Sequence, residues 1–177
     1  MGLVYISSVT ASADATVEFT GIDATYNEYQ FHFVNMHPAT NGVGFKFQVN
    51  AADASGFNEV ITSTFFEAYH AEDDSTTTLG YRVYQDQAQG TAYQDIAVYP
   101  GNGNDQSASG VLTLYDPSST TYVKHFVSRS NSVNYTDWSR EVHAAGYINT
   151  TNAIDEISFK FGSGNIDEGS IHMYGVG

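Results

Sequence analysis

The chain alternates apolar and polar residues over many short stretches. Tyr29, Phe31 and Phe33 alternate with Gln30 and His32, and residues 45–49 repeat the pattern. A period of two places every second side chain on the same face of an extended strand, so each stretch predicts a strand with one face in a core. Further strands are expected at residues 3–9, 17–19, 79–84, 91–99, 109–116, 121–130, 138–149, 157–161 and 171–174.

Clusters of turn-forming residues separate these stretches. They are GIDATYNE at 21–28, HPATNG at 37–42, PGNGNDQSASG at 100–110, DPSST at 116–120 and NTTNAID at 149–155. Many short strands at fairly regular spacing predict an all-β sandwich or barrel. Because no repeat, linker or charge block divides the chain, we expect a single domain over residues 1–177.

Two segments need a closer look. Residues 58–70 place several apolar side chains on one helical face, but the β-branched run Val60-Ile61-Thr62 favours a strand, which we expect there. Residues 154–177 predict two strands joined by a Gly/Asn/Asp-rich loop into a hairpin. Such a hairpin would tie down the end of the chain.

The predicted strands at 121–130 and 138–149 carry apolar side chains on both faces. A strand with one face in water should alternate more cleanly. The second apolar face fits either a contact between subunits or a central strand that the same chain covers on both sides. The candidate interface residues are Tyr122, Phe126, Trp138, Val142 and Tyr147.

Composition limits the possible partners. The 177 residues include 20 acidic and 6 basic side chains, for a formal charge of −14. Without clustered Lys and Arg, we expect neither nucleic acid nor an anionic membrane as a partner. The chain has no cysteine, which excludes disulfides and thiolate zinc sites. Residues 1–15 lack the charged and apolar regions of a signal peptide, so we expect synthesis in a cytoplasm without export.

No motif of a known catalytic site is present. The sequence lacks a G-x-S-x-G elbow, a P-loop, a Rossmann glycine pattern and an H-E-x-x-H zinc motif. Adjacent acids such as Asp73 and Asp74 would point to opposite faces of a strand, so their adjacency is no evidence for the paired carboxylates of a glycan hydrolase. Acids far apart in the sequence could still meet in the fold. We therefore expect a protein that is not an enzyme and that holds no cofactor.

The loop GNGND at 101–105 is the strongest candidate for ligand contact. With Asp95 or Asp116 it could offer oxygen ligands to calcium, which takes about 6–8 of them, although an ordinary loop has the same composition. Tyrosine and Trp138 suit the rims of interfaces or of sugar-binding grooves. The candidate ligand-facing residues are Tyr99, Asn102, Asn104 and Asp105.

The C-terminal segment GNIDEGSIHMYGVG carries a resemblance to a group of small β-rich proteins of tailed phages, many of them marine. Chains of that group often end in the pattern SGNI…G-x-I-x-x-YG. Here Ser163-Gly164-Asn165-Ile166 are followed by Gly169, Ile171, Tyr174 and Gly175. Residues 17–33, 116–126 and 145–161 are similar more loosely.

The resemblance implies a fold and a setting. Members are described as virion structural, tail-fibre-like or head-decoration proteins with jelly-roll-like antiparallel sandwiches. It therefore implies a non-enzymatic protein of the virion surface, with a major capsid protein or tail proteins as partners. Because a closed oligomer would bury the second apolar face of the two strands and protect edge strands, we expect the protein to assemble with itself, as a homotrimer. A carbohydrate- or receptor-binding module on the same scaffold, contacting host surface glycan, is the alternative. The shared motifs are structural, so the resemblance transfers no catalytic residue.

Overall fold

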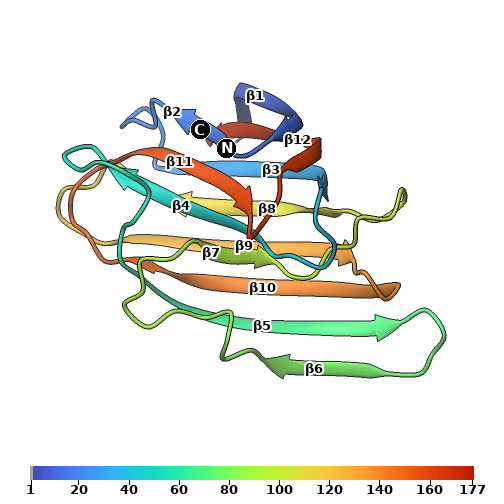
Figure 1. Ribbon diagram of the computed structural model, residues 1–177. Helices are drawn as coiled ribbons and strands as arrows, with labels where there is room; N and C mark the ends of the chain where they lie inside the picture. The colour runs from blue at the N-terminus through green and yellow to red at the C-terminus, as the bar shows by residue number, and fades with distance from the viewer. Residues whose placement is uncertain (1) are drawn as a thin grey trace.

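A computed structural model of the protein describes residues 2–177. These residues form twelve β-strands and no helix, arranged in two antiparallel sheets (Figure 1). The strands are β1 (Leu3–Asp14), β2 (Val17–Thr20), β3 (Glu28–Pro38), β4 (Phe45–Ala51), β5 (Ile61–Ala71), β6 (Thr77–Tyr81), β7 (Gln94–Ala97), β8 (Ala108–Tyr115), β9 (Lys124–Val133), β10 (Trp138–Ile148), β11 (Ile154–Phe161) and β12 (Ile166–Val176). The prediction of an all-β sandwich is confirmed.

The strand order is that of a jelly roll with two insertions. The large sheet runs β1-β12-β3-β8-β9-β10-β5-β6 and the small sheet runs β2-β11-β4-β7. Without β5, β6, β9 and β10, two four-stranded sheets remain, and the chain passes between them as a double Greek key does. The inserted strands pair with one another beyond β8 and extend the large sheet past the small one (Figure 1).

The core between the two sheets is built largely from phenylalanine. Phe31 and Phe33 of β3 face Phe45 and Phe159 of the small sheet, with ring centroids 5.3 Å apart for Phe33–Phe45 and 5.6 Å for Phe31–Phe159. These four rings are fully buried. Each contributes about 1.5–3 kcal/mol by burial alone, so the alternation read from the sequence also identifies the main source of stability.

A second, smaller core lies under the inserted strands, where β7 at the edge of the small sheet packs on β9 and β10. Phe65, Val98, Val142 and Ala144 form it. Strand β7 is held there by polar groups as well, because the Ser130 hydroxyl of β9 donates to the Ile96 carbonyl of β7 over 2.6 Å. Side-chain hydrogen bonds to a crossing backbone replace the ladder that a further strand would supply.

The structure decides two uncertain segments. Residues 61–70 lie in β5, so the expectation of a strand is confirmed for most of the 58–70 segment. The expected C-terminal hairpin is wrong, because β11 pairs with β2 and β4 whereas β12 pairs with β1 and β3. Both strands turn an apolar face inward, and the chain crosses between the sheets at 162–165 so that these faces meet across the core. Alternation specifies a strand and its inner face but not its neighbour.

Candidate functional site

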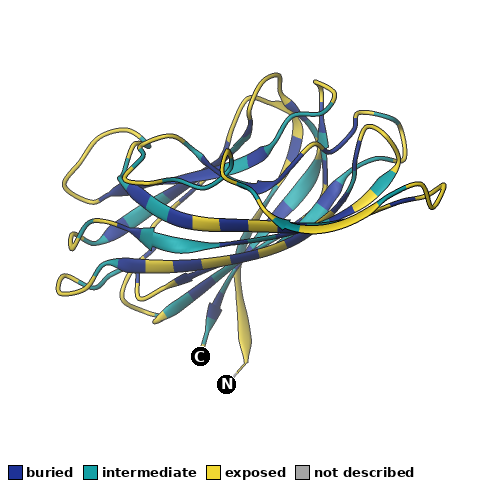
Figure 2. Cartoon of the chain, turned by 90° about the horizontal axis from the view of Figure 1, so that it is seen from below, coloured by how far each residue is buried: buried dark blue, intermediate teal, exposed yellow. Residues whose placement is uncertain are grey.

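The outer edge of β1 is the first of three surfaces with functional potential. One edge of β1 pairs with β12, and the other has no partner strand within residues 2–177. At its start the strand is open on both faces, since Leu3, Val4, Tyr5 and Ile6 are 50%, 44%, 57% and 38% exposed. Figure 2 shows this exposed stretch beside the C-terminus, projecting from the body of the sandwich.

The β1 edge has only one of the usual protections against pairing with another chain, a bulge between Tyr5 and Ser7. Natural edge strands are kept short or carry Lys, Pro or inward-pointing charges. Strand β1 is 12 residues long and has no charged residue before Asp14; a register shift between Tyr5 and Ser7 is its one irregularity. The other sheet edges in the described part of the chain are 4 or 5 residues long. Strand β1 is therefore the edge best suited to strand addition.

The outer face of the inserted strands is the second surface. A shallow groove of about 370 Å³ lies over Ala145, with Val127 and Tyr147 among its lining residues. Beside it the rings of Phe66 and His143 stack with centroids 4.8 Å apart. No part of residues 2–177 covers this face, so β9 and β10 are central strands with one apolar face left open to solvent.

Charged groups border this groove. The Arg129 Nε donates to Glu141 over 2.6 Å, and His143 Nε2 lies 2.9 Å from the same carboxylate oxygen. These hydrogen bonds, that of Arg129 first, lower the pKa of Glu141. Of the five candidate interface residues, only Tyr147 lies on this face.

The candidate interface residues do not form one surface. Phe126 and Val142 are 1% and 0% exposed, so the expectation that they contact another subunit is wrong. Phe126 packs on Phe47 at 5.0 Å in the main core, and Val142 belongs to the smaller one. Tyr122 is exposed in the turn before β9, and Trp138 is half-buried against Tyr69 with centroids 4.9 Å apart. In β9 and β10, the face that carries Phe126 and Val142 therefore packs into the core of the same chain.

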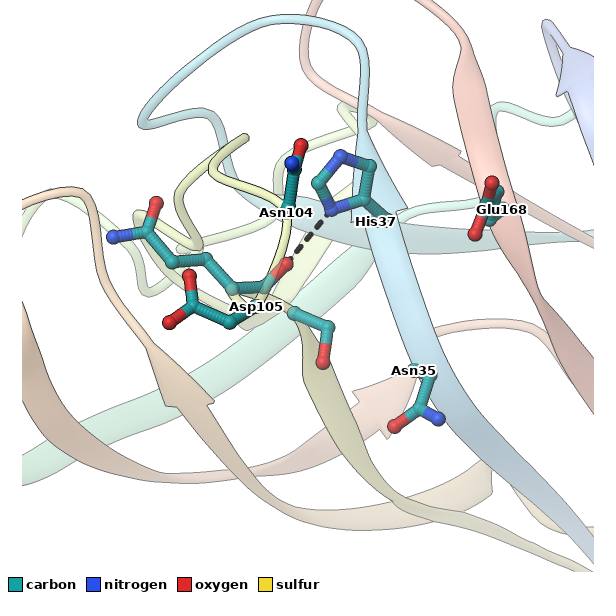
Figure 3. Close-up of a pocket in the computed structure, with 7 residues that line it drawn as sticks. Asn35, His37, Asn104, Asp105 and Glu168 are labelled. Carbon is teal, nitrogen blue, oxygen red and sulfur yellow. Dashed lines mark hydrogen bonds between the residues drawn. The ribbon is translucent and has the colours of Figure 1, made fainter.

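The third surface is a polar crevice at one end of the sandwich, shown in Figure 3. Asn104 and Asp105 line a hollow of about 440 Å³ together with Asn35, His37 and Glu168. Residues 104–105 come from the loop before β8, Asn35 and His37 from β3, and Glu168 from β12. Three segments far apart in the sequence therefore bring their polar side chains together.

Only two of the four candidate ligand-facing residues line this crevice. The Asn102 amide donates to the Ala39 carbonyl over 3.3 Å, so that side chain fastens the loop. Tyr99 lies under the guanidinium of Arg140, with Arg140 Cζ 5.1 Å from its ring centroid, and its hydroxyl accepts from Gln85 over 3.2 Å. Asn104 and Asp105 line the crevice, and ligand contact by these two residues stays a prediction.

Irregular backbone shapes the crevice. The β3–β8 register shifts between Phe33 and Met36, and the β12–β3 register shifts on both sides of Glu168. Asn35 adopts φ 53° and Gly169 φ 127°. A Cβ on Gly169 would lie 2.8 Å from the Asn35 carbonyl oxygen, so the two bulges meet where only glycine fits.

A second hollow of about 390 Å³ continues the crevice toward β1. It shares Asn35 and Glu168 with the first and adds Thr10, Ala11 and Val34. The crevice is thus polar at the loop end and partly apolar at the β1 end. Neither hollow has a Lys or Arg in its lining.

The two acids considered as further calcium ligands for the 101–105 loop have other surroundings. Asp95 pairs with Lys46 over 3.0 Å, and burial raises the pKa of Asp95 against the effect of that lysine. Asp116 follows the end of β8 opposite to the 101–105 loop. Within residues 2–177, no three His, Asp or Glu side chains are close enough together to hold a metal ion.

Sequence reasoning missed the β1 edge and three of the crevice residues, Asn35, His37 and Glu168. The absence of charge before Asp14 in an alternating segment was a signal for the open β1 edge. The position of Asn35 between Val34 and Met36 was a signal for the bulge at the crevice, because Asn is depleted in strands and tolerates a left-handed backbone. No local signal joins the crevice residues, since the fold alone brings them together.

The comparisons with known proteins leave the family open. No protein-family model matches the chain, and no curated protein matches it. Residues 2–177 contain no helix with the length and apolar character needed to cross a bilayer.

Proposed function

We propose that the protein is a non-enzymatic structural subunit that assembles with further copies of itself on the surface of a virus particle. The observation that carries the proposal is the long, uncharged and unpaired edge of β1. Its free backbone N–H and C=O groups offer a template for hydrogen bonding to another chain. Its exposed apolar side chains add surface that association would bury on both faces of the strand.

The lack of acidic side chains favours the β1 edge as the place where copies make contact. A chain with a formal charge of −14 repels its own copies over most of its surface, and close like charges oppose association. Residues 2–13 of the β1 edge carry no acidic side chain, so two copies can approach there with the least repulsion. A two-fold pairing would place β1 against itself, whereas the homotrimer expected from the sequence would place it against a different patch of the next copy.

The particle setting rests on the resemblance of the C-terminal pattern, and the physical properties are compatible with it. A β-sandwich without cysteine does not depend on the redox state of its surroundings. An acidic exterior keeps exposed loops soluble and away from nucleic acid. The partners proposed on the particle are the major capsid protein or the tail proteins, with the subunit acting as a head-decoration or tail-fibre-like component.

Immunogold labelling of purified particles tests the setting. Label on heads would identify a decoration protein and label on tails a fibre component, and either result would support the proposal. Particles that carry no label, alongside label on a known capsid protein in the same preparation, would contradict it.

A further inference from the structure

We propose that the polar crevice between the 104–107 loop, β3 and β12 binds a neutral oligosaccharide. This inference goes beyond assembly, because the crevice residues Asn35, His37, Asn104, Asp105 and Glu168 take no part in the β1 edge. It rests on unused hydrogen-bonding groups, on the shape of the two hollows and on the sign of the charge.

The crevice contains polar side chains that have no partner within the protein. Among residues 2–177, the side chains of Asn35, Asn104, Asp105 and Glu168 form no hydrogen bond or ion pair with another residue. Amides donate and accept, whereas carboxylates accept, so together they match hydroxyl groups, which do both. A sugar that replaces the water on these groups would gain hydrogen bonds that are assisted by charge at Asp105 and Glu168.

The frame around these groups is fixed. His37 Nδ1 lies 2.8 Å from the Gln106 carbonyl oxygen, which ties β3 to the loop. The Gln106 side chain donates to Asp137 over 2.7 Å and accepts from the Gly103 N–H over 3.0 Å. The polar groups therefore stand on a loop held at several points, which lowers the entropy lost when a ligand binds.

The two hollows suit a ligand with both polar edges and apolar faces. Val34, which is 42% exposed, supplies an apolar patch beyond Asn35 and Glu168, where the C–H face of a sugar ring can rest. Volumes of about 440 and 390 Å³ lie within the usual range of about 300–1,000 Å³ for ligand sites. Because the two hollows share two lining residues, they fit an elongated ligand with more than one ring.

Charge excludes other small ligands. Two carboxylates and no Lys or Arg line the crevice, so phosphorylated, sulfated or carboxylated ligands would be repelled. A metal ion has no set of three acidic or imidazole side chains to coordinate it in the described residues. A neutral sugar is the class that uses amides, carboxylates and an apolar patch together.

A glycan array with neutral and acidic oligosaccharides tests the proposal, followed by calorimetry with the strongest neutral hit. The test variant is Asn35→Gly/Glu168→Gln, because glycine keeps the backbone of Asn35 and glutamine keeps the shape of Glu168. The control is Glu72→Gln, an exposed acid in the turn after β5. We expect neutral glycans to bind wild type and the control alike, and the test variant to bind at least about tenfold more weakly.

Three results would overturn it: no neutral glycan bound, binding that the test variant leaves unchanged, or binding restricted to acidic glycans. The altered residues lie outside β1, and only Thr10 and Ala11 at the far end of the crevice belong to that strand. Repeating it with Val4→Lys/Ile6→Lys separates the two proposals, since that variant should lose self-association and keep its affinity for the glycan.

Discussion

The carboxylate of Glu67 on β5 lies 2.6 Å from the guanidinium of Arg140 on β10, and both side chains are buried. Arg82 binds the other oxygen of the same carboxylate. Arg140 is also enclosed by aromatic rings, with Cζ 4.9 Å from the centroid of Tyr69 and 5.1 Å from that of Tyr99. Two of the six basic residues therefore secure the inserted strands of the large sheet.

Removing the charge of Glu67 should destabilise the protein strongly. In Glu67→Gln two guanidinium groups lose their counter-charge, and breaking a buried ion pair from one side costs about 3–5 kcal/mol. Urea unfolding at neutral pH measures the loss as a lower midpoint. The control Glu72→Gln, on the exposed turn after β5, should stay within about 0.5 kcal/mol of wild type. Equal midpoints for both variants would show that the pair adds nothing to stability.

The pair His32 and His172 should make stability depend on pH. The two residues are opposite each other on β3 and β12. Burial, and then the neighbouring His172, lower the pKa of His32 below its usual 6.5. The unfolded chain thus binds the proton more readily than the folded one, and stability is lost as pH falls below about 6.5.

Replacing His172 by Gln tests this coupling. We expect the pKa of His32 to rise toward its usual value while remaining below it, because burial is the larger cause. An NMR titration of the imidazole protons reports that pKa directly, and His125→Gln on the other half of the sheet serves as control. An unchanged titration of His32 in His172→Gln would contradict the assigned repulsion.

Gly175, near the end of β12, should tolerate no side chain. A Cβ there would lie 2.2 Å from the ring of Tyr26, which covers the glycine. Gly175→Val must therefore displace Tyr26 and its edge-on packing on Tyr29, at 5.7 Å between centroids. We expect a fall of several degrees in Tm, whereas Gly2→Ala, with no atom within 4 Å of the new Cβ, should melt like wild type. If Gly175→Val melted at the same temperature as wild type, the ring of Tyr26 would not cover Gly175 in solution.

The sequence predicts individual strands well and their neighbours poorly. Phe31, Phe33 and Phe159 alternate with polar residues and all lie in the core, as expected. The pairing of β11 with β12 was wrong because two strands adjacent in sequence can face each other across a core as well as lie side by side. The inserted strands bury Glu67 and Arg140 on the inner face, which no periodicity rule anticipates, since their partnership spans 73 residues.

In the candidate sites, too, local sequence identified single residues but not the neighbours that the fold brings to them. Asn104 and Asp105 were identified from composition, because turn-forming residues with free polar groups cluster in their loop. Asn35 and Glu168 were not, because bulges in two other strands bring them to that loop. The reading of Phe126 and Val142 as interface residues was wrong because an apolar face says only that something covers it, and here the same chain does.

The native mass of the protein tests the central claim most directly. Size-exclusion chromatography with light scattering should show a closed oligomer for wild type and for Leu79→Lys, a control on the exposed opposite edge strand β6. Val4→Lys/Ile6→Lys, which places two charges on the β1 edge, should have an unchanged circular dichroism spectrum and the mass of a single chain. A wild-type protein that is monomeric, or an oligomer that persists in Val4→Lys/Ile6→Lys, would contradict assembly through β1.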